Sequence, residues 1–249
     1  MPKFFAQTKD IRNNKIIIKN DYNHIKNVLR KKIGDKLTIC NSENEKEYFT
    51  IIEEIREDSI VCNIIEEVDN NVESNINITI FQGLPKSDKM ELIIQKCVEI
   101  GVKRFVPVNM ERAIVKLTNN DIIKKCERWN KIAEVASKQS GRNLIPQVKK
   151  VVNYNEFINL AKDLDLLIVC YEEEKNLTLK QTLKDIKNNF NELNIGVLIG
   201  PEGGITPKEI ELIKQNENTK IVTIGKRILR TETVALVVSG IILYELESK

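Results

Sequence analysis

The sequence has little of what builds a metal centre or a disulfide framework. It contains one histidine and five cysteines in 249 residues, and the cysteines are far apart, with no C-x-x-C pair. Metal sites made of these residue types need several of them at short spacings, so no metal ligands are predicted. The number of cysteines is odd and no signal peptide is apparent, which indicates reduced thiols and a cytoplasmic protein.

Long apolar runs are also missing. No stretch approaches the roughly 18 residues that a membrane-spanning helix requires, and the apolar C-terminal run is broken by Ser239 and Gly240. We therefore expect no contact with a membrane. The formal net charge is only +3, so overall charge gives weak support for a nucleic-acid partner, and only local clusters of basic residues count.

Apolar residues are present in sufficient number, at 41%, to form packed cores in two modest domains or one large domain. Residues 1–70 are typical of a small β-rich domain, because short apolar segments alternate with turn-forming stretches. A short helix running into a basic turn is predicted over His24–Asp35, and a hairpin loop over Asn41–Lys46. The predicted strands are Ile16–Ile18, Leu37–Cys40, Tyr48–Ile55 and Ser59–Ile65.

The acidic, asparagine-rich segment Glu66–Asn75 is the predicted linker, and a second domain follows over residues 76–249. In this domain apolar strands alternate with amphipathic helices, an order that predicts a parallel sheet covered by helices. The predicted strands are Ile76–Gln82, Arg104–Val108, Gln147–Val151 and Leu166–Cys170. The predicted helices run from Asp88 to near Gly101 and over Asp121–Gln139, Tyr154–Leu164 and Thr178–Asn189.

The C-terminal part of the chain contains two strand-to-helix units in tandem. In the first, the apolar strand Ile195–Ile199 stops at Gly200-Pro201-Glu202-Gly203-Gly204. A helix follows, because Thr206 and Glu209 form a capping box and Pro207 suits the first helical position.

The second unit has the strand Ile221–Ile224, a turn that begins at Gly225, and a helix that Thr231 can cap. That helix is apolar on nearly all sides over Val234–Leu243, so it should be buried in the domain or in a partner subunit. Two loops thus leave the carboxyl ends of parallel strands, where open α/β sheets bind ligands. The glycines of the first loop, at positions 200, 203 and 204, would also be expected in an ordinary turn that binds no ligand. Glu202 puts a carboxylate near a helix N-terminus, which favours a neutral or cationic ligand over a phosphate.

The strings Ile199-Gly200-Pro201-Glu202-Gly203-Gly204 and Gly225-Lys226-Arg227-Ile228-Leu229-Arg230-Thr231-Glu232-Thr233 resemble the two signature loops of the SPOUT RNA methyltransferases. The sequence is similar over nearly its whole length to the ribosomal small-subunit RNA methyltransferase E family. This resemblance implies an α/β fold in which a PUA-like β-barrel precedes a C-terminal SPOUT domain with a parallel sheet and a trefoil knot. It also implies methylation of N3 of a uridine in 16S ribosomal RNA by S-adenosylmethionine, and a homodimer formed through the SPOUT domain.

The resemblance further implies that S-adenosylmethionine is held among the loops after Ile199 and Ile224, with Leu167–Tyr171 as another wall. The implied cofactor-binding residues are Leu167, Tyr171, Leu198, Ile199, Gly200, Gly203, Ile224, Gly225, Ile228, Leu229 and Val234. Val234 stands where the family usually has alanine.

Basic residues cluster in the predicted barrel. Such a run is usually a solvated face, but the clustering and the resemblance together favour contacts with RNA phosphates. Gln139 and Arg142 follow a long helix and are either a polar helix end or part of the RNA side of the pocket, since arginine binds phosphates and stacks on bases. The RNA-binding residues predicted in the barrel are Arg12, Lys26, Arg30, Lys31 and Lys32.

Two residues of the second loop are candidates for catalysis. Uridine N3 carries a proton at neutral pH and is a poor nucleophile until that proton leaves. Arg230 could stabilise negative charge on the uracil oxygens, and Glu232 could orient Arg230 or accept the proton, directly or through water. Alternatively, both residues only tie the loop to its helix, since a glutamate is favourable in a first turn.

Two other functions stay open at this point. Methylation of a ribose 2′-oxygen by a related knotted fold would also explain the glycine loops. A non-catalytic RNA-binding module would use the barrel alone, although the intact signature loops speak against it. The expected partner is 16S ribosomal RNA, either as naked RNA or within the small ribosomal subunit.

Overall fold

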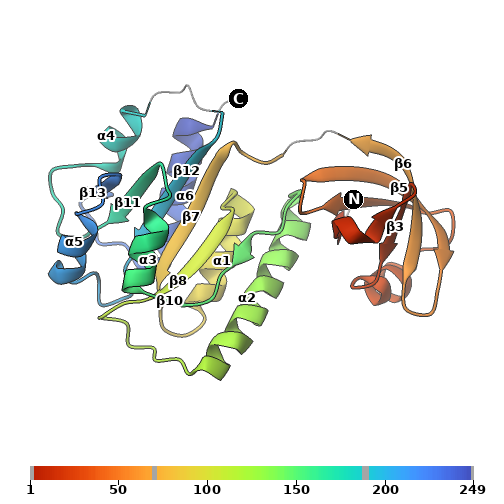
Figure 1. Ribbon diagram of the computed structural model, residues 1–249, viewed down its shortest axis with the longest axis horizontal. Helices are drawn as coiled ribbons and strands as arrows, with labels where there is room; N and C mark the ends of the chain where they lie inside the picture. Colours follow the sequence, from red (N-terminus) through yellow and green to blue (C-terminus); the bar gives the residue numbers. More distant parts are fainter. Residues whose placement is uncertain (1–2, 69–71, 187–190, 248–249) are drawn as a thin grey trace. The chain divides into compact units, whose positions relative to one another are not determined.

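The computed structural model describes residues 3–68, 72–186 and 191–247 (Figure 1). Its contacts divide the chain into two compact units, of which one comprises residues 1–73 with 137–145, and the other residues 74–136 with 146–249. The division near residue 73 falls inside the predicted linker, whose residues 69–71 lie outside the described ranges. No sequence pattern indicated that residues 137–145 belong with the N-terminal unit.

The N-terminal unit is a sheet that curls around an apolar core (Figure 1). The strand order is β1-β4-β5-β6-β3-β2, with β1 parallel to β4 and the other pairs antiparallel. The strands predicted from alternation are confirmed, and two short strands that pattern did not reveal, β1 and β2, lie at the sheet edges. The strands are β1 (Lys3–Ala6), β2 (Ile11–Arg12), β3 (Lys15–Ile18), β4 (Lys36–Asn41), β5 (Lys46–Ile55) and β6 (Ile60–Val68).

Two short helical turns, η1 (Thr8–Asp10) and η2 (His24–Val28), complete the described part of the N-terminal unit. Ile25 of η2 is fully buried in the core, which fixes this turn on the sheet. The basic turn follows, and Arg30 adopts a left-handed backbone with φ of 53°. The predicted short helix with a basic turn after it is therefore confirmed.

The C-terminal unit is a parallel sheet with the order β10-β8-β7-β12-β11-β13, and β9 also pairs with β8. Its strands are β7 (Ile76–Gly83), β8 (Arg104–Asn109), β9 (Gln147–Val148), β10 (Val152–Asn153), β11 (Leu166–Cys170), β12 (Leu193–Ile199) and β13 (Thr219–Val222). Its helices are α1 (Lys89–Ile100), α2 (Asn119–Ser140), α3 (Tyr154–Ala161), α4 (Leu179–Lys184), α5 (Pro207–Ile213) and α6 (Thr231–Leu246). The α/β class predicted for this part is confirmed, and the trefoil knot implied by the resemblance stays a prediction.

Helices cover both faces of this sheet. Phe157 of α3 and Ile210 of α5 share a core with Phe81, Leu167 and Leu198, so α3 and α5 lie on one face. Helices α1 and α6 pack against each other on the opposite face (Figure 1). Eight of the 16 residues of α6 are buried, so the burial expected of its apolar sequence is met on one side of the helix only, and Val237, Ile241 and Tyr244 stay exposed. No helix in the described part of the chain is long and apolar enough to cross a membrane.

Several boundaries differ from the prediction. The strand expected at Ile221–Ile224 is β13 (Thr219–Val222), and Thr223 after it forms an isolated parallel bridge with Thr178. Thr231 is the first residue of α6, and Arg230 occupies the cap position with φ of −69° and ψ of 150°. The predicted helix Thr178–Asn189 is shorter, with Thr178 as the cap of α4, and residues 187–190 are outside the described ranges.

Candidate active site

Strands β12, β11 and β13 end side by side at the carboxyl edge of the parallel sheet. Ile199 pairs with Cys170, and Cys170 pairs with Val222, so the three strands end at the same level. The two signature loops therefore flank the loop that starts at Tyr171. Ligands bind at this edge in open α/β sheets because the loops and unpaired backbone groups face it.

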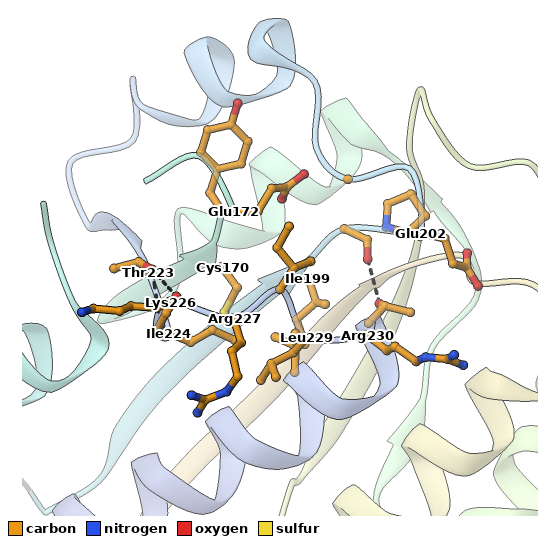
Figure 2. A pocket seen from close by; sticks show the side chains of 18 of the residues that line it. Cys170, Glu172, Ile199, Glu202, Thr223, Ile224, Lys226, Arg227, Leu229 and Arg230 are labelled. Carbon is orange, nitrogen blue, oxygen red and sulfur yellow. Dashed lines mark hydrogen bonds between the residues drawn. The ribbon is translucent and has the colours of Figure 1, made fainter. Parts of the chain in front are cut away.

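A cavity of about 430 Å³ lies among these loops (Figure 2). Its volume is in the range of small-molecule sites. The predicted residues that line it are Tyr171, Ile199, Gly200, Ile224, Gly225, Ile228, Leu229, Arg230 and Val234. Other lining residues lie in the predicted wall or in the two signature loops, namely Cys170, Pro201, Glu202, Gly204, Lys226, Arg227 and Thr231. The sequence did not reveal Lys89, Glu172 and Thr223.

Three predicted cofactor residues lie elsewhere. The side chains of Leu167 and Leu198 are fully buried in the core beneath α3 and α5, so they support the strands and do not line the cavity. Gly203 packs against Arg112, whose Nη1 donates to the Gly203 carbonyl oxygen at 3.1 Å. Residues on one strand alternate between faces, and the sequence did not reveal which face each of them occupies.

The first signature loop is shaped by close approaches that only glycine allows. Gly204 has φ of +73°, and a Cβ built on it would lie 2.2 Å from Oε1 of Glu172. A Cβ on Gly200 would lie 3.0 Å from backbone and side-chain atoms of Gly204 and Ile205. The loop is closed by a bond from the Gly204 N–H to the Pro201 carbonyl at 2.9 Å. These glycines are therefore required for the turn itself.

The helix after this loop begins as the sequence predicted. The Thr206 hydroxyl accepts from the Glu209 N–H at 3.2 Å, and the Thr206 N–H donates to Oε2 of Glu209 at 2.9 Å. The Glu209 side chain is buried, and its Oε1 also accepts from the Glu111 N–H at 3.0 Å. The capping box thus fixes the exit of the first loop and anchors a neighbouring segment to it.

The two signature loops are tied together by Thr231 and Gln82. The Thr231 hydroxyl donates to the Gly200 carbonyl at 2.8 Å, a bond drawn in Figure 2, and Nε2 of Gln82 donates to Thr231 at 2.8 Å. Gln82 is completely buried at the end of β7. The sequence contains one signal for this role of Gln82, because a polar residue stands at the end of an otherwise apolar strand.

Charged groups gather on the side of the cavity next to α1. Nζ of Lys89 lies 2.7 Å from Oε1 of Glu202 and 3.5 Å from Oε2 of Glu232. The Lys86 N–H also donates to Glu202 at 3.1 Å, so this carboxylate faces the beginning of α1 and not that of α5. Burial acts to raise the pKa of Glu202, but Lys89 and the backbone donors outweigh it and lower that pKa. The pKa of Lys89 is raised, chiefly by Glu202.

The second signature loop presents exposed cations. Lys226 and Arg227 lie on one side of the cavity, and Arg230 lies on the other with Glu202 (Figure 2). Among the described residues, none forms an ion pair with these three cations. Ile228 between them is 88% exposed. The cavity thus combines an apolar floor with free positive charge at its edge.

The predicted RNA-binding residues of the N-terminal unit are at its surface, except that Lys31 is half-buried. Lys26 is hydrogen-bonded to the Tyr22 hydroxyl and lies 4.9 Å from the centre of its ring. Gln139, at the end of α2, is exposed.

Arg142, the other predicted RNA-binding residue after α2, is buried. Its side chain is only 6% exposed and forms an ion pair of 2.6 Å with Glu73, which is itself 2% exposed. Oε1 of Glu73 also accepts from the Asn143 N–H at 3.1 Å. The guanidinium therefore ties residues 137–145 to Glu73 within the N-terminal unit, and a contact of Arg142 with RNA stays a prediction.

The chain resembles known RNA methyltransferases. The profile of an RNA methyltransferase domain matches residues 72–243, and that of an RNA methyltransferase PUA domain matches residues 17–65. The ribosomal RNA small subunit methyltransferase E of Bacillus subtilis is 36% identical over 91% of this chain and 88% of its own length. The protein of the same name from Mesomycoplasma hyopneumoniae is 33% identical over 95% of this chain and 96% of its own.

A solved structure is similar over the full length. The crystal structure of the ribosomal RNA small subunit methyltransferase E from Neisseria gonorrhoeae, bound to S-adenosyl methionine, superimposes with a TM-score of 0.82. The two sequences are 28% identical, and the match covers 99% of this chain and 98% of that one.

Proposed function

The chain belongs to the ribosomal RNA small subunit methyltransferase E family, and we propose that it methylates N3 of a uridine in 16S ribosomal RNA with S-adenosylmethionine. The observation that carries this proposal is the cavity at the carboxyl edge of the parallel sheet, which both signature loops line. A cofactor bound there would lie beside the exposed arginine that we assign to the reaction.

The residues of the cavity fit this cofactor. Ile199, Ile224 and Leu229 offer an apolar surface to an adenosine, and Gly225, with φ of +135°, leaves the backbone accessible. Glu172 and Glu202 on the wall suit the positive charges of a sulfonium and an α-ammonium group. When bound, S-adenosylmethionine supplies an activated methyl group on that sulfonium.

The task of the protein is then placement and charge stabilisation. For each methyl group transferred, the uridine loses its N3 proton, an N3–carbon bond forms and the sulfur–carbon bond breaks. Negative charge develops on the uracil oxygens as the proton leaves. Arg230 is exposed at the cavity edge and has no ion-pair partner among the described residues, so its guanidinium is available to these oxygens.

We assign Glu232 as the acceptor of the uridine N3 proton, which reaches the carboxylate through water. Its side chain is 14% exposed, lies in the first turn of α6 two residues after Arg230, and is not part of the cavity wall. Water therefore has to connect the carboxylate to a base in the cavity.

The N-terminal unit would hold the RNA. Arg12, Arg30 and Lys32 are exposed on it, and cations of this kind bind phosphates without reading the bases.

Assembly into a homodimer through the C-terminal unit is part of the proposal. Val237, Ile241 and Tyr244 form an exposed apolar stripe on α6, and Tyr244 is 87% exposed.

The test is nucleoside mass spectrometry of 16S ribosomal RNA after incubation with the protein and S-adenosylmethionine. We expect 3-methyluridine at a single position, and none when S-adenosylhomocysteine replaces the cofactor. A 2′-O-methylated nucleoside would support the ribose methyltransferase instead. Tight RNA binding without any methylation, and without calorimetric binding of S-adenosylhomocysteine, would support the non-catalytic module.

A further inference from the structure

We propose that Lys89 is a positioning residue that couples the two signature loops through one ammonium group and so holds Glu232 in place. The inference rests on the proposed function. Lys89 is the first residue of α1 and belongs to neither loop. Its Nζ contacts Glu202 of the first loop at 2.7 Å and Glu232 of the second loop at 3.5 Å.

The two carboxylates depend on this ammonium group. Oε2 of Glu232 is buried and accepts no hydrogen bond from the described residues, so Lys89 is the charge that compensates it. A buried carboxylate without a compensating charge is strongly unfavourable. Glu202 has a second donor in the Lys86 N–H, and therefore keeps a partner when Lys89 is removed.

The contacts of Lys89 differ from those of an ordinary surface ion pair. Lys96 on the same helix pairs with Glu99 three residues later, so that contact joins nothing beyond α1. Lys89 instead joins α1, the loop after β12 and the start of α6, which are far apart in the sequence. Without its charge, Glu202 and Glu232 repel each other, and both loops lose a common anchor beside the cavity.

The neighbouring contacts explain why hydrogen bonds alone do not replace this anchor. Thr231 binds the Gly200 carbonyl and so ties the base of the loops together. The Thr231 bond does not involve the side chains of Glu202 and Glu232. Glu202 also accepts from the Lys86 N–H, whereas the placement of Glu232 is left to Lys89. Replacing Lys89 should therefore displace the Glu232 side chain and lower the methylation rate, and it should leave the fold intact.

The experiment compares Lys89→Met and Lys89→Arg with Lys96→Met as a matched control on the same helix. Hydrogen exchange of residues 200–204 and 225–232 is measured in the cofactor-free full-length protein, and single-turnover methylation is measured at saturating cofactor. Lys89→Met should raise exchange in both loops and lower the rate, each by about tenfold or more. Lys89→Arg and Lys96→Met should stay within about threefold of wild type.

A double variant that removes one positive and one negative charge separates the effect of the ammonium group on the loops from a loss of overall stability. Adding Glu202→Gln to Lys89→Met removes one of the two repelling carboxylates, so it should recover part of the exchange protection in the cofactor-free protein. This variant and Lys89→Arg carry the test if Lys89→Met alone does not fold.

The proposal is overturned if Lys89→Met leaves both exchange and rate within about twofold of wild type. It is equally overturned if Lys89→Arg loses as much as Lys89→Met, because the charge would then not matter. Failure of the wild-type protein to methylate RNA would refute the proposed function, whereas exchange in the cofactor-free protein would still decide the role of Lys89.

Discussion

Arg230 and Glu232 lie two residues apart and have different surroundings. Arg230 is exposed at the cavity, whereas the Glu232 carboxylate is held near Lys89. We expect Arg230→Lys and Glu232→Gln each to lower the single-turnover rate by about a hundredfold, the range for losing one charge-stabilising or proton-accepting group. Lysine keeps the charge of Arg230 but loses the planar fork of donors that fits two oxygens.

The control for these variants is Glu211→Gln, which removes an exposed carboxylate of α5 that pairs with Lys214 on the protein surface. Cofactor affinity, RNA affinity and thermal stability are measured alongside the rate. Rates within a few fold of wild type for both Arg230→Lys and Glu232→Gln would refute the assignment of chemistry to these residues.

The five cysteines are free thiols in different surroundings. Burial raises the pKa of Cys40, Cys97 and Cys170 to about 12 and that of Cys62 to about 11. A raised pKa keeps the thiol protonated and unreactive at neutral and mildly alkaline pH. Cys126 is only partly buried.

Native protein treated with iodoacetamide should therefore be alkylated first at Cys126, as peptide mass spectrometry would show. Unfolding the protein in denaturant should make all the thiols react at similar rates. Alkylation of Cys97 as fast as that of Cys126 in the native protein would contradict this order.

At the scale of elements, the turn after η2 carries the RNA-binding prediction. Lys31 is fixed by its N–H bond to the Ile25 carbonyl at 3.0 Å, and the Lys32 N–H donates to Asp35 at 2.8 Å. Replacing Arg30, Lys31 and Lys32 by alanine should weaken RNA binding. It should also flatten the slope of log affinity against log salt by roughly 2 to 3, since each lost phosphate contact removes about 0.7–0.9.

The control replaces Lys15 and Lys46, which lie in the same sheet but are already paired with Glu53 and Glu67. Affinities from filter binding at several salt concentrations decide the outcome, and calorimetry should show unchanged cofactor affinity. An unchanged salt slope in the triple variant would remove the turn from the RNA-binding surface.

At the scale of the whole molecule, the exposed stripe on α6 predicts self-association. Light scattering at micromolar concentration should give the mass of a dimer for the wild-type protein. Ile241→Glu should shift it toward a monomer, because a carboxylate would be buried without a partner at a symmetric interface. Leu160→Glu, at an exposed apolar position on α3, should leave the dimer intact. A monomeric wild-type protein would contradict the prediction.

Local features were determined by the sequence alone. The capping box of Thr206 and Glu209 and the bounds of β11 could be predicted, because they depend on hydrogen bonds and apolar runs within a few residues. The two signature loops were found for the same reason. Nine of the 19 residues that line the cavity could be named from the resemblance of these loops and of the wall beside them.

Contacts between distant parts of the chain were decided only by the tertiary structure. Arg142 pairs with Glu73, Gln82 binds Thr231, and Lys89 reaches two loops, yet in each case nothing near the residue indicates its partner. The position of β11 between β12 and β13 is equally invisible in sequence order. Local hydrogen bonding and periodicity act over one or two turns, whereas the partner of a buried charge is chosen by how the sheet brings remote segments together.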